Sequence, residues 1–236
     1  MKAREAATRL LLVVLLLGLG GCQNPGQASK QKIETTGSCG DRLSSEQGMA
    51  MSMIQQQIMG RHFYSALAEL ERLPLSPDTR LLKADSYRHL GKWHQAEPLY
   101  KQLVGTCLAG RAYHGLGLVS AYQGDTDSAM DWLEQAVSAA PVSADIRNDF
   151  GFLLLVMGQD DRAYDQLFTA LELEPEHPNA GKNLWFLLLK NEQHRQAETL
   201  ASRYHWGEQT QQEMLSAISR FRPLALNSTI SLGEQK

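Results

Sequence analysis

Two stretches of equal length, Leu116–Pro141 (LGLVSAYQGDTDSAMDWLEQAVSAAP) and Phe150–Pro175 (FGFLLLVMGQDDRAYDQLFTALELEP), decide the fold because they repeat one pattern. Each has glycine at its second and ninth residues, alanine five residues later and proline at its end, and equivalent positions lie 34 residues apart. The alanine recurs along the chain at steps of 33 or 34 residues, at Ala96, Ala129, Ala163 and Ala197. A fixed period of this length predicts an array of similar units that stack on one another.

The pattern resembles the tetratricopeptide repeat (TPR), a helix-turn-helix unit with small residues at its helix crossing and proline near its end. The resemblance implies an all-α fold: a right-handed solenoid of about five helix-turn-helix repeats plus a C-terminal capping helix. We expect the solenoid over residues 46–209 and the capping helix over 210–222. The five units are expected at residues 46–76, 77–109, 110–143, 144–177 and 178–211.

The repeated residues have a physical reason in helix packing. Small side chains at the crossing let two helices approach within about 8–10 Å, and glycine supplies the turn between them. Asp125 and the pair Asp160-Asp161 should favour the start of each second helix through capping and the helix dipole. No stretch alternates apolar and polar residues convincingly, so we expect essentially no sheet.

The start of the chain has the features of a targeting segment rather than of a folded element. Lys2, Arg4 and Arg9 precede the apolar run Leu10–Leu19, an order typical of a secretory signal peptide. The run is shorter than the roughly 20 apolar residues that a membrane-spanning helix needs. Residues 1–21 are therefore expected to be a signal peptide that is removed.

The sequence Leu19-Gly20-Gly21-Cys22 at the end of this run resembles the lipobox of bacterial lipoproteins. The resemblance implies cleavage before Cys22 and a covalent lipid on its thiol, which anchors the chain to a membrane. Gln23 at the next position implies the outer membrane, periplasmic face. An ordinary signal peptide with an accidental cysteine is the alternative. Residues 22–45 and 223–236 are expected to be a flexible tether and a flexible tail.

The two remaining cysteines, Cys39 and Cys107, suggest a possible disulfide. In an oxidising compartment they could pair and pin the tether to the second repeat. The alternative is two free thiols, with Cys107 buried at a helix end.

Little in the sequence points to catalysis. It contains no HExxH, GxSxG, P-loop or dinucleotide-binding motif, and its seven histidines form no metal-ligand spacing. The formal charge of −3 leaves no positive surplus to neutralise nucleic-acid phosphates. We therefore expect no enzyme activity, no metal, no nucleic-acid partner, no small-molecule substrate and no cofactor besides the lipid on Cys22.

TPR arrays usually bind partners along the concave face, which is lined by the first helix of each unit. The residues that resemble those binding positions in the second and third units are Asp78, Leu81, Asp85, Arg88, His89, Arg111, His114, Leu118, Ala121 and Tyr122. In the fourth and fifth units they include Asn148, Phe152, Leu155, Val156, Lys182, Phe186 and Leu189.

The first helices of the fourth and fifth units are apolar nearly all round, in FGFLLLVM (150–157) and LWFLLL (184–189). A helix needs only one apolar stripe for packing, so such a helix is covered on both sides or binds something. This predicts a hydrophobic groove around Phe152, Leu155, Val156, Phe186 and Leu189 that fits an amphipathic partner helix. The alternative is that Thr210–Arg222 folds back and fills it.

A lipoprotein signal, a tether and about five TPRs resemble a set of outer-membrane assembly factors. Among these, the chain resembles most the TPR lipoprotein of the Tad (tight adherence, Flp pilus) system, which is related to the pilotins of type IV pili. The resemblance implies that it binds a secretin subunit and assists its localisation and assembly. A scaffold for peptidoglycan enzymes and an accessory lipoprotein of β-barrel assembly are the alternatives, because TPR motifs do not specify a partner.

Overall fold

The computed structural model describes residues 35–224, and these form eleven helices, of which the first ten make five consecutive pairs. The predicted signal peptide, the lipid site Cys22, tether residues 22–34 and tail residues 225–236 lie outside the described part. The first helix of each pair, the A helix, is α2 (Ser45–Met59), α4 (Pro77–His89), α6 (Ala109–Gln123), α8 (Ala144–Val156) or α10 (Pro178–Lys190). The second, the B helix, is α3 (Phe63–Leu70), α5 (Trp93–Lys101), α7 (Thr126–Ala139), α9 (Asp160–Leu173) or α11 (His194–Arg203). A last helix, α12 (Glu208–Arg220), follows them.

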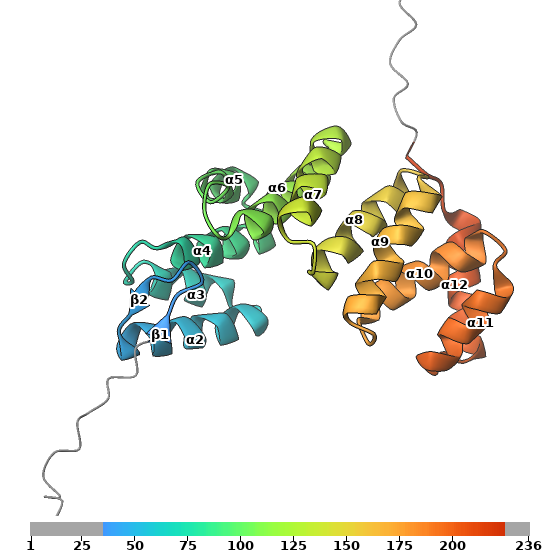
Figure 1. Ribbon diagram of the computed structural model, residues 1–236, viewed down its shortest axis with the longest axis horizontal. Coiled ribbons are helices and arrows are strands. Elements are labelled where there is room, and N and C mark those ends of the chain that lie inside the picture. The colour runs from blue at the N-terminus through green and yellow to red at the C-terminus, as the bar shows by residue number, and fades with distance from the viewer. Residues whose placement is uncertain (1–34, 225–236) are drawn as a thin grey trace, which may run out of the picture. The chain divides into compact units, whose positions relative to one another are not determined.

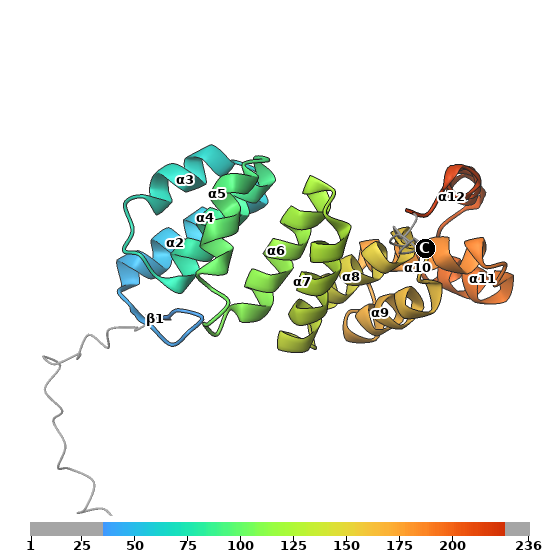
Figure 2. The same cartoon turned by 90° about the horizontal axis from the view of Figure 1, so that it is seen from above.

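The helical pairs follow one another in chain order (Figures 1 and 2), and each B helix packs on the A helix of the next pair. This arrangement confirms the predicted all-α repeat solenoid of five helix-turn-helix units with a closing helix. The closing helix begins two residues earlier than expected, at Glu208, and ends at Arg220.

The turn inside each unit needs one residue with positive φ. After α4, α6 and α8 this residue is glycine: Gly91, Gly124 and Gly158 have φ of 70°, 81° and 71°. In the two degenerate units a larger residue takes the same conformation, Arg61 with φ 62° and Glu192 with φ 57°. The glycine of the first unit, Gly60, has φ −75° and is not the turn residue. The backbone of Arg61 and Glu192 is therefore strained in the left-handed region, because a residue with a Cβ disfavours the positive φ that glycine adopts freely.

The repeated glycines of the A helices lie where the two helices of a unit cross. A Cβ on Gly117 would come within 2.6 Å of Leu133 Cγ, and one on Gly151 within 2.7 Å of Leu167 Cγ. The matching alanines of the B helices, Ala129 and Ala163, are fully buried in the same core. The repeat period therefore records a steric requirement for close helix contact.

Helix starts follow the sequence in part. Asp125 caps α7 by accepting the Ser128 N–H at 3.1 Å, as expected. The expected capping by Asp160 and Asp161 is wrong, because Gln159 occupies the cap and both aspartates lie in the first turn of α9. There they still face the positive end of the helix dipole.

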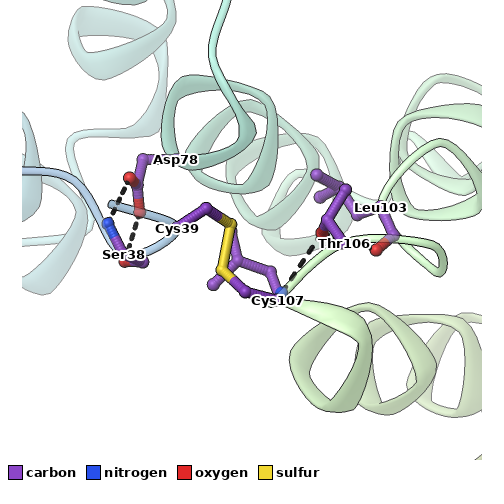
Figure 3. Close-up of a disulfide and its surroundings, with 7 residues drawn as sticks. Ser38, Cys39, Asp78, Leu103, Thr106 and Cys107 are labelled. Carbon is purple, nitrogen blue, oxygen red and sulfur yellow. Dashed lines mark hydrogen bonds between the residues drawn. A yellow bond between two sulfur atoms is a disulfide. The ribbon is translucent and has the colours of Figure 1, made fainter. Parts of the chain in front are cut away.

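Residues 35–43, which were expected to belong to the flexible tether, form regular structure. Strands β1 (Thr35–Thr36) and β2 (Arg42–Leu43) pair antiparallel in a small hairpin, so a minimal sheet exists where none was expected. Within this hairpin Cys39 is bonded to Cys107, and Ser38 donates its N–H to Asp78 Oδ2 at 2.8 Å (Figure 3). These contacts fasten residues 35–43 to the second unit, although a tether was predicted through residue 45.

The buried apolar residues form three clusters rather than one continuous core in the described part of the chain. One lies under α2–α4, one under α4–α6, and the largest under α7–α11. The A helices α4 and α6 pack directly on each other, as do α8 and α10, whereas α6 and α8 make far fewer contacts. The A-helix face is consequently open between α6 and α8. No helix among residues 35–224 has the length and apolar character needed to cross a membrane.

Candidate functional site

A groove of about 870 Å³ lies on the A-helix face, where α6 and α8 separate. It continues onto the end of α4 and is bounded at its other side by Leu224, after α12. The predicted site residues that line it are Leu118, Tyr122, Asn148, Phe152 and Val156, together with Asp85, Arg88, His89, Arg111, His114 and Ala121. The repeat positions thus identified most of the lining.

One wall of the groove is an apolar strip made by Leu118, Ala121, Tyr122, Phe152 and Val156, at the ends of α6 and α8. Two of its large side chains face solvent, with Tyr122 66% exposed and Phe152 49% exposed. Tyr122 is held by stacking on Trp93, with ring centroids 5.2 Å apart. Exposed aromatic groups in a concave surface are typical of sites that bind another polypeptide.

The end of the groove near α4 is polar and already internally bonded. Tyr100 donates its hydroxyl proton to Asp85 Oδ1 at 2.6 Å, and Arg88 Nε donates to the Tyr100 oxygen at 3.2 Å. Burial, and then the charge of Asp85, raises the pKa of Tyr100 above its ordinary value of 10.0, so the phenol keeps its proton. Arg111 forms an ion pair with Asp85 Oδ2 at 3.4 Å. This end presents charge that is held in place by α4, α5 and α6.

A second polar row crosses the A helices on the floor of the groove. His114 Nε2 on α6 lies 2.7 Å from Asp149 Oδ2 on α8, and Asn148 Nδ2 donates to the other oxygen of Asp149 at 2.9 Å. Asn183 on α10 continues the row by donating to Asn148 Oδ1 at 2.9 Å. Each of these groups therefore has its partner within the fold, and the row fixes the spacing of three A helices.

His89 lies at the edge of the polar end and stacks on Phe63 of the first unit, with ring centroids 4.8 Å apart. Arg88 lies 3.0 Å from His89 Nε2, and since arginine only donates, this nitrogen accepts. Partial burial, and then the positive charge of Arg88, lowers the pKa of His89 below 6.5. The imidazole is therefore neutral at pH 7.

Four predicted groove residues do not line the groove. Leu155 and Leu189 are buried in the largest core cluster, 2% and 7% exposed, so their assignment to the groove is wrong. Both are covered because α10 packs directly on α8, and α12 packs on α10. Lys182 is exposed on α10 but outside the groove lining.

Phe186, the fourth, is half-buried against the segment that follows α12, where it meets Phe221 edge-on with centroids 5.1 Å apart. The predicted groove is therefore covered at its α10 end, in line with the alternative that the C-terminal segment folds back. It is open between α6 and α8.

Several lining residues were missed, among them Asp149 and Leu224. Asp149 stands one residue beyond the position used for prediction, and no signal in the sequence marks it. Leu224 belongs to the segment after α12 and lines the groove. The only hint of this in the sequence is that an apolar residue follows Pro223. Residues 35–224 contain no group of three or more metal-ligating side chains arranged to hold an ion.

The chain matches the tetratricopeptide repeat family over residues 79–110 and again over residues 110–143. It is 33% identical over 187 residues to the TPR repeat-containing protein PA4299 of Pseudomonas aeruginosa, which covers 78% of this chain and 74% of that protein. The chain belongs to the TPR proteins. The TPR fold implies a scaffold for protein–protein interaction, typically without enzyme activity.

Solved TPR structures agree with the fold. The thermophilic TPR protein TTC0263 of Thermus thermophilus superposes with a TM-score of 0.58 at 20% identity, covering 73% of this chain and 96% of that one. MamA (residue 41 to its end) from Desulfovibrio magneticus gives a TM-score of 0.52 at 18% identity, covering 70% and 95%. At these identities the likeness concerns the TPR fold alone.

Proposed function

We propose that this TPR protein is a lipid-anchored adaptor at the periplasmic face of the outer membrane. In this proposal it binds a segment of a secretin or another pilus or secretion subunit and assists its localisation and assembly, as in Tad (Flp pilus) biogenesis. The observation that carries the proposal is the open groove between α6 and α8, with exposed Tyr122 and Phe152 on its apolar strip.

The groove suits a polypeptide segment better than a small polar ligand. The apolar strip offers a row of side-chain contacts, while the charged groups of the other end are engaged with each other. A segment that presents a row of apolar side chains buries Tyr122 and Phe152 without breaking these bonds, and burial contributes about 25 cal/mol per Å² of apolar surface. An amphipathic helix has this form, as the sequence predicts.

The disulfide supports the compartment. A bond between Cys39 and Cys107 persists in an oxidising environment such as the periplasm and is rare in the cytosol. We propose Cys22 as the site of lipid attachment, and Cys22→Ser should move the chain from the membrane fraction to the soluble periplasmic fraction. Retention of Cys22→Ser in the membrane fraction after salt and carbonate washes would contradict a lipid anchor at this residue.

The central test is co-purification of the tagged full-length chain from its native host in mild detergent. The wild type should retain a secretin or pilus subunit, and Phe152→Glu together with Tyr122→Ser should lose it at least tenfold. Phe168→Glu is the matched control, because Phe168 is a 43% exposed aromatic on α9 outside this groove. Circular dichroism should be unchanged for all three proteins.

Two outcomes would overturn the proposal. One is subunit capture that does not change in the groove variant. The other is capture of a peptidoglycan enzyme or a β-barrel assembly component in place of a pilus or secretion subunit, which would establish the corresponding alternative.

A further inference from the structure

Neighbouring units are joined by a side-chain contact that recurs at one position of the repeat. The first residue of a B helix meets a residue of the next A helix, two positions before the turn residue with positive φ. Phe63 stacks on His89 in this way, with ring centroids 4.8 Å apart. Trp93 stacks on Tyr122 at the next junction, with centroids 5.2 Å apart and the rings within 10° of parallel. A junction contact thus joins the first unit to the second and the second unit to the third.

The junction contact is ionic between the last two units and lacks both rings and charges between the third and the fourth. At the last junction Lys190 Nζ donates to Asp160 Oδ2. The equivalent residues between the third and fourth units are Thr126, which begins α7, and Val156, which ends α8. Neither of these short side chains has a ring or a charge with which to bridge the units. Both line the groove, which lies at this junction because α6 and α8 separate there.

This open junction is a notch in the wall of the groove, formed by Thr126 and Val156 together with the exposed rings of Tyr122 and Phe152. The carbonyl oxygen of Val156 lies at the end of α8 and accepts the N–H of Leu224 at 2.8 Å. Leu224 borders the same groove but is itself 48% exposed, so the notch stays accessible beside it. Two rings and two methyl-bearing side chains make the notch mainly apolar.

The neighbouring junction shows which chemical group fills such a space. There the indole of Trp93 covers one face of Tyr122, a residue that also borders the notch. Burial of a large apolar side chain in a pocket of this kind is a main source of affinity in polypeptide recognition. A charged group would lose its hydration there, and none of the four residues of the notch carries a charge to compensate. The notch therefore favours a large aliphatic or aromatic side chain.

We infer that the notch is the anchor subsite of the groove, where one large apolar side chain of the bound polypeptide inserts between Thr126 and Val156 and supplies the contact that this junction lacks. These two residues then determine specificity, because a larger or charged pair would close the subsite. The bound segment also joins the third unit to the fourth, as side-chain contacts join the other units. The inference rests on the proposed function for the presence of a bound polypeptide, and it deepens that function by naming the side chain that is recognised.

The test copies an existing junction contact into the notch and measures the binding of a single side chain. Thr126→Trp with Val156→Tyr reproduces the aromatic pair of the neighbouring junction. Asp127→Trp is the matched control, because it adds the same ring to an exposed residue of α7 outside the groove lining. The probe is N-acetyl-tryptophanamide, which carries the side chain that Trp93 provides at the neighbouring junction. It is titrated into the purified, isotope-labelled full-length chain, and binding is followed by NMR of the backbone amides.

The wild type and the control should bind the probe with equal affinity, with the largest chemical-shift changes at Thr126, Val156 and Tyr122. The variant with the aromatic pair should bind the probe at least tenfold more weakly, because its own rings fill the notch. Thr126→Asp with Val156→Lys is a second variant with the same expected loss, and it decides the test if the aromatic pair prevents folding. It copies the contact between Asp160 and Lys190. Circular dichroism identifies the variants that keep the fold.

Equal affinity for the probe in the wild type and both junction variants would overturn the inference, and so would chemical-shift changes confined to residues outside the notch. Probe binding that appears only after Leu224→Ala would show that the chain itself fills the subsite, which would also overturn it.

Failure of the proposed function gives a different result. If the probe binds in the notch of the wild type alone but the host yields no secretin or pilus subunit, the inference stands and the proposed function fails. If both junction variants capture the subunit as well as the wild type does and bind the probe equally, the proposed function stands and the inference fails.

Discussion

His114 Nε2 on α6 and Asp149 Oδ2 on α8 lie 2.7 Å apart, and this contact bridges two A helices that otherwise make few contacts. Both side chains are partly shielded, 19% and 32% exposed, so water screens the interaction only in part. The bridge therefore sets the width of the groove from its floor.

A double-mutant cycle on His114→Ala and Asp149→Ala measures this bridge. A hydrogen bond of this kind contributes about 1 kcal/mol net, so we expect a coupling energy near that value in urea denaturation. The exposed pair Arg72–Glu69, at 3.3 Å and 75% and 45% exposed, is the control and should couple by less than about 0.5 kcal/mol. Equal coupling for the two pairs would show that His114 and Asp149 do not brace the helices.

Gly117→Ala and Gly151→Ala should each destabilise the fold by about 1–3 kcal/mol. The new Cβ would lie 2.6 Å from a carbon of Leu133 or 2.7 Å from one of Leu167, and overpacking outweighs the better helix propensity of alanine. Gly105→Ala is the matched control, because an added Cβ there would meet no atom within 4 Å. Thermal unfolding followed by circular dichroism measures the stability of the three variants, and Gly105→Ala should be the most stable. A Gly151→Ala variant as stable as the wild type would contradict the steric account of the repeat.

Loss of the disulfide should cost stability without loss of the fold. The bond closes a sequence separation of 68 residues, for which the chain-entropy model gives about 4 kcal/mol. Cys39→Ser with Cys107→Ser should lower the urea midpoint accordingly and leave helix content unchanged. Addition of reductant should lower the urea midpoint of the wild type to that of the variant. A wild-type urea midpoint that does not change with reductant would indicate free thiols.

Stability should fall as the pH decreases below about 6.5, in part through His89. Its pKa is lowered in the folded chain, so the unfolded chain binds the proton first and gains free energy as the pH falls. His89→Asn should reduce the loss of stability between pH 7.5 and pH 5.5, measured by urea denaturation at both values. An equal loss of stability in His89→Asn and in the wild type would contradict this account.

The repeat and most of the groove could be predicted because they depend on local rules. Gly117 and Gly151 stand at helix crossings that only small residues permit, so their spacing gives the unit length and the face of each A helix. From that face the positions of Leu118, Tyr122, Phe152 and Val156 follow directly.

What could not be predicted depends on how neighbouring units pack. Leu155 and Ala121 occupy equivalent repeat positions, yet Leu155 is buried where α8 meets α10 and Ala121 is exposed where α6 and α8 separate. The positive φ of Arg61 and Glu192 is likewise imposed by the chain on both sides of the turn, against the preference of these residues. The path of Phe221–Leu224 across Phe186 to Val156 is a long-range contact that no periodicity in the sequence contains.

The Cys39–Cys107 bond also determines how the chain carries mechanical load. Tension applied at the N-terminal side of Cys39 passes through the sulfur atoms to the linker between α5 and α6 and bypasses helices α2–α5. If the chain hangs from a lipid, pulling by its cargo would therefore stretch only the units from α6 onward, and the first two units would remain folded as a relaxed spacer.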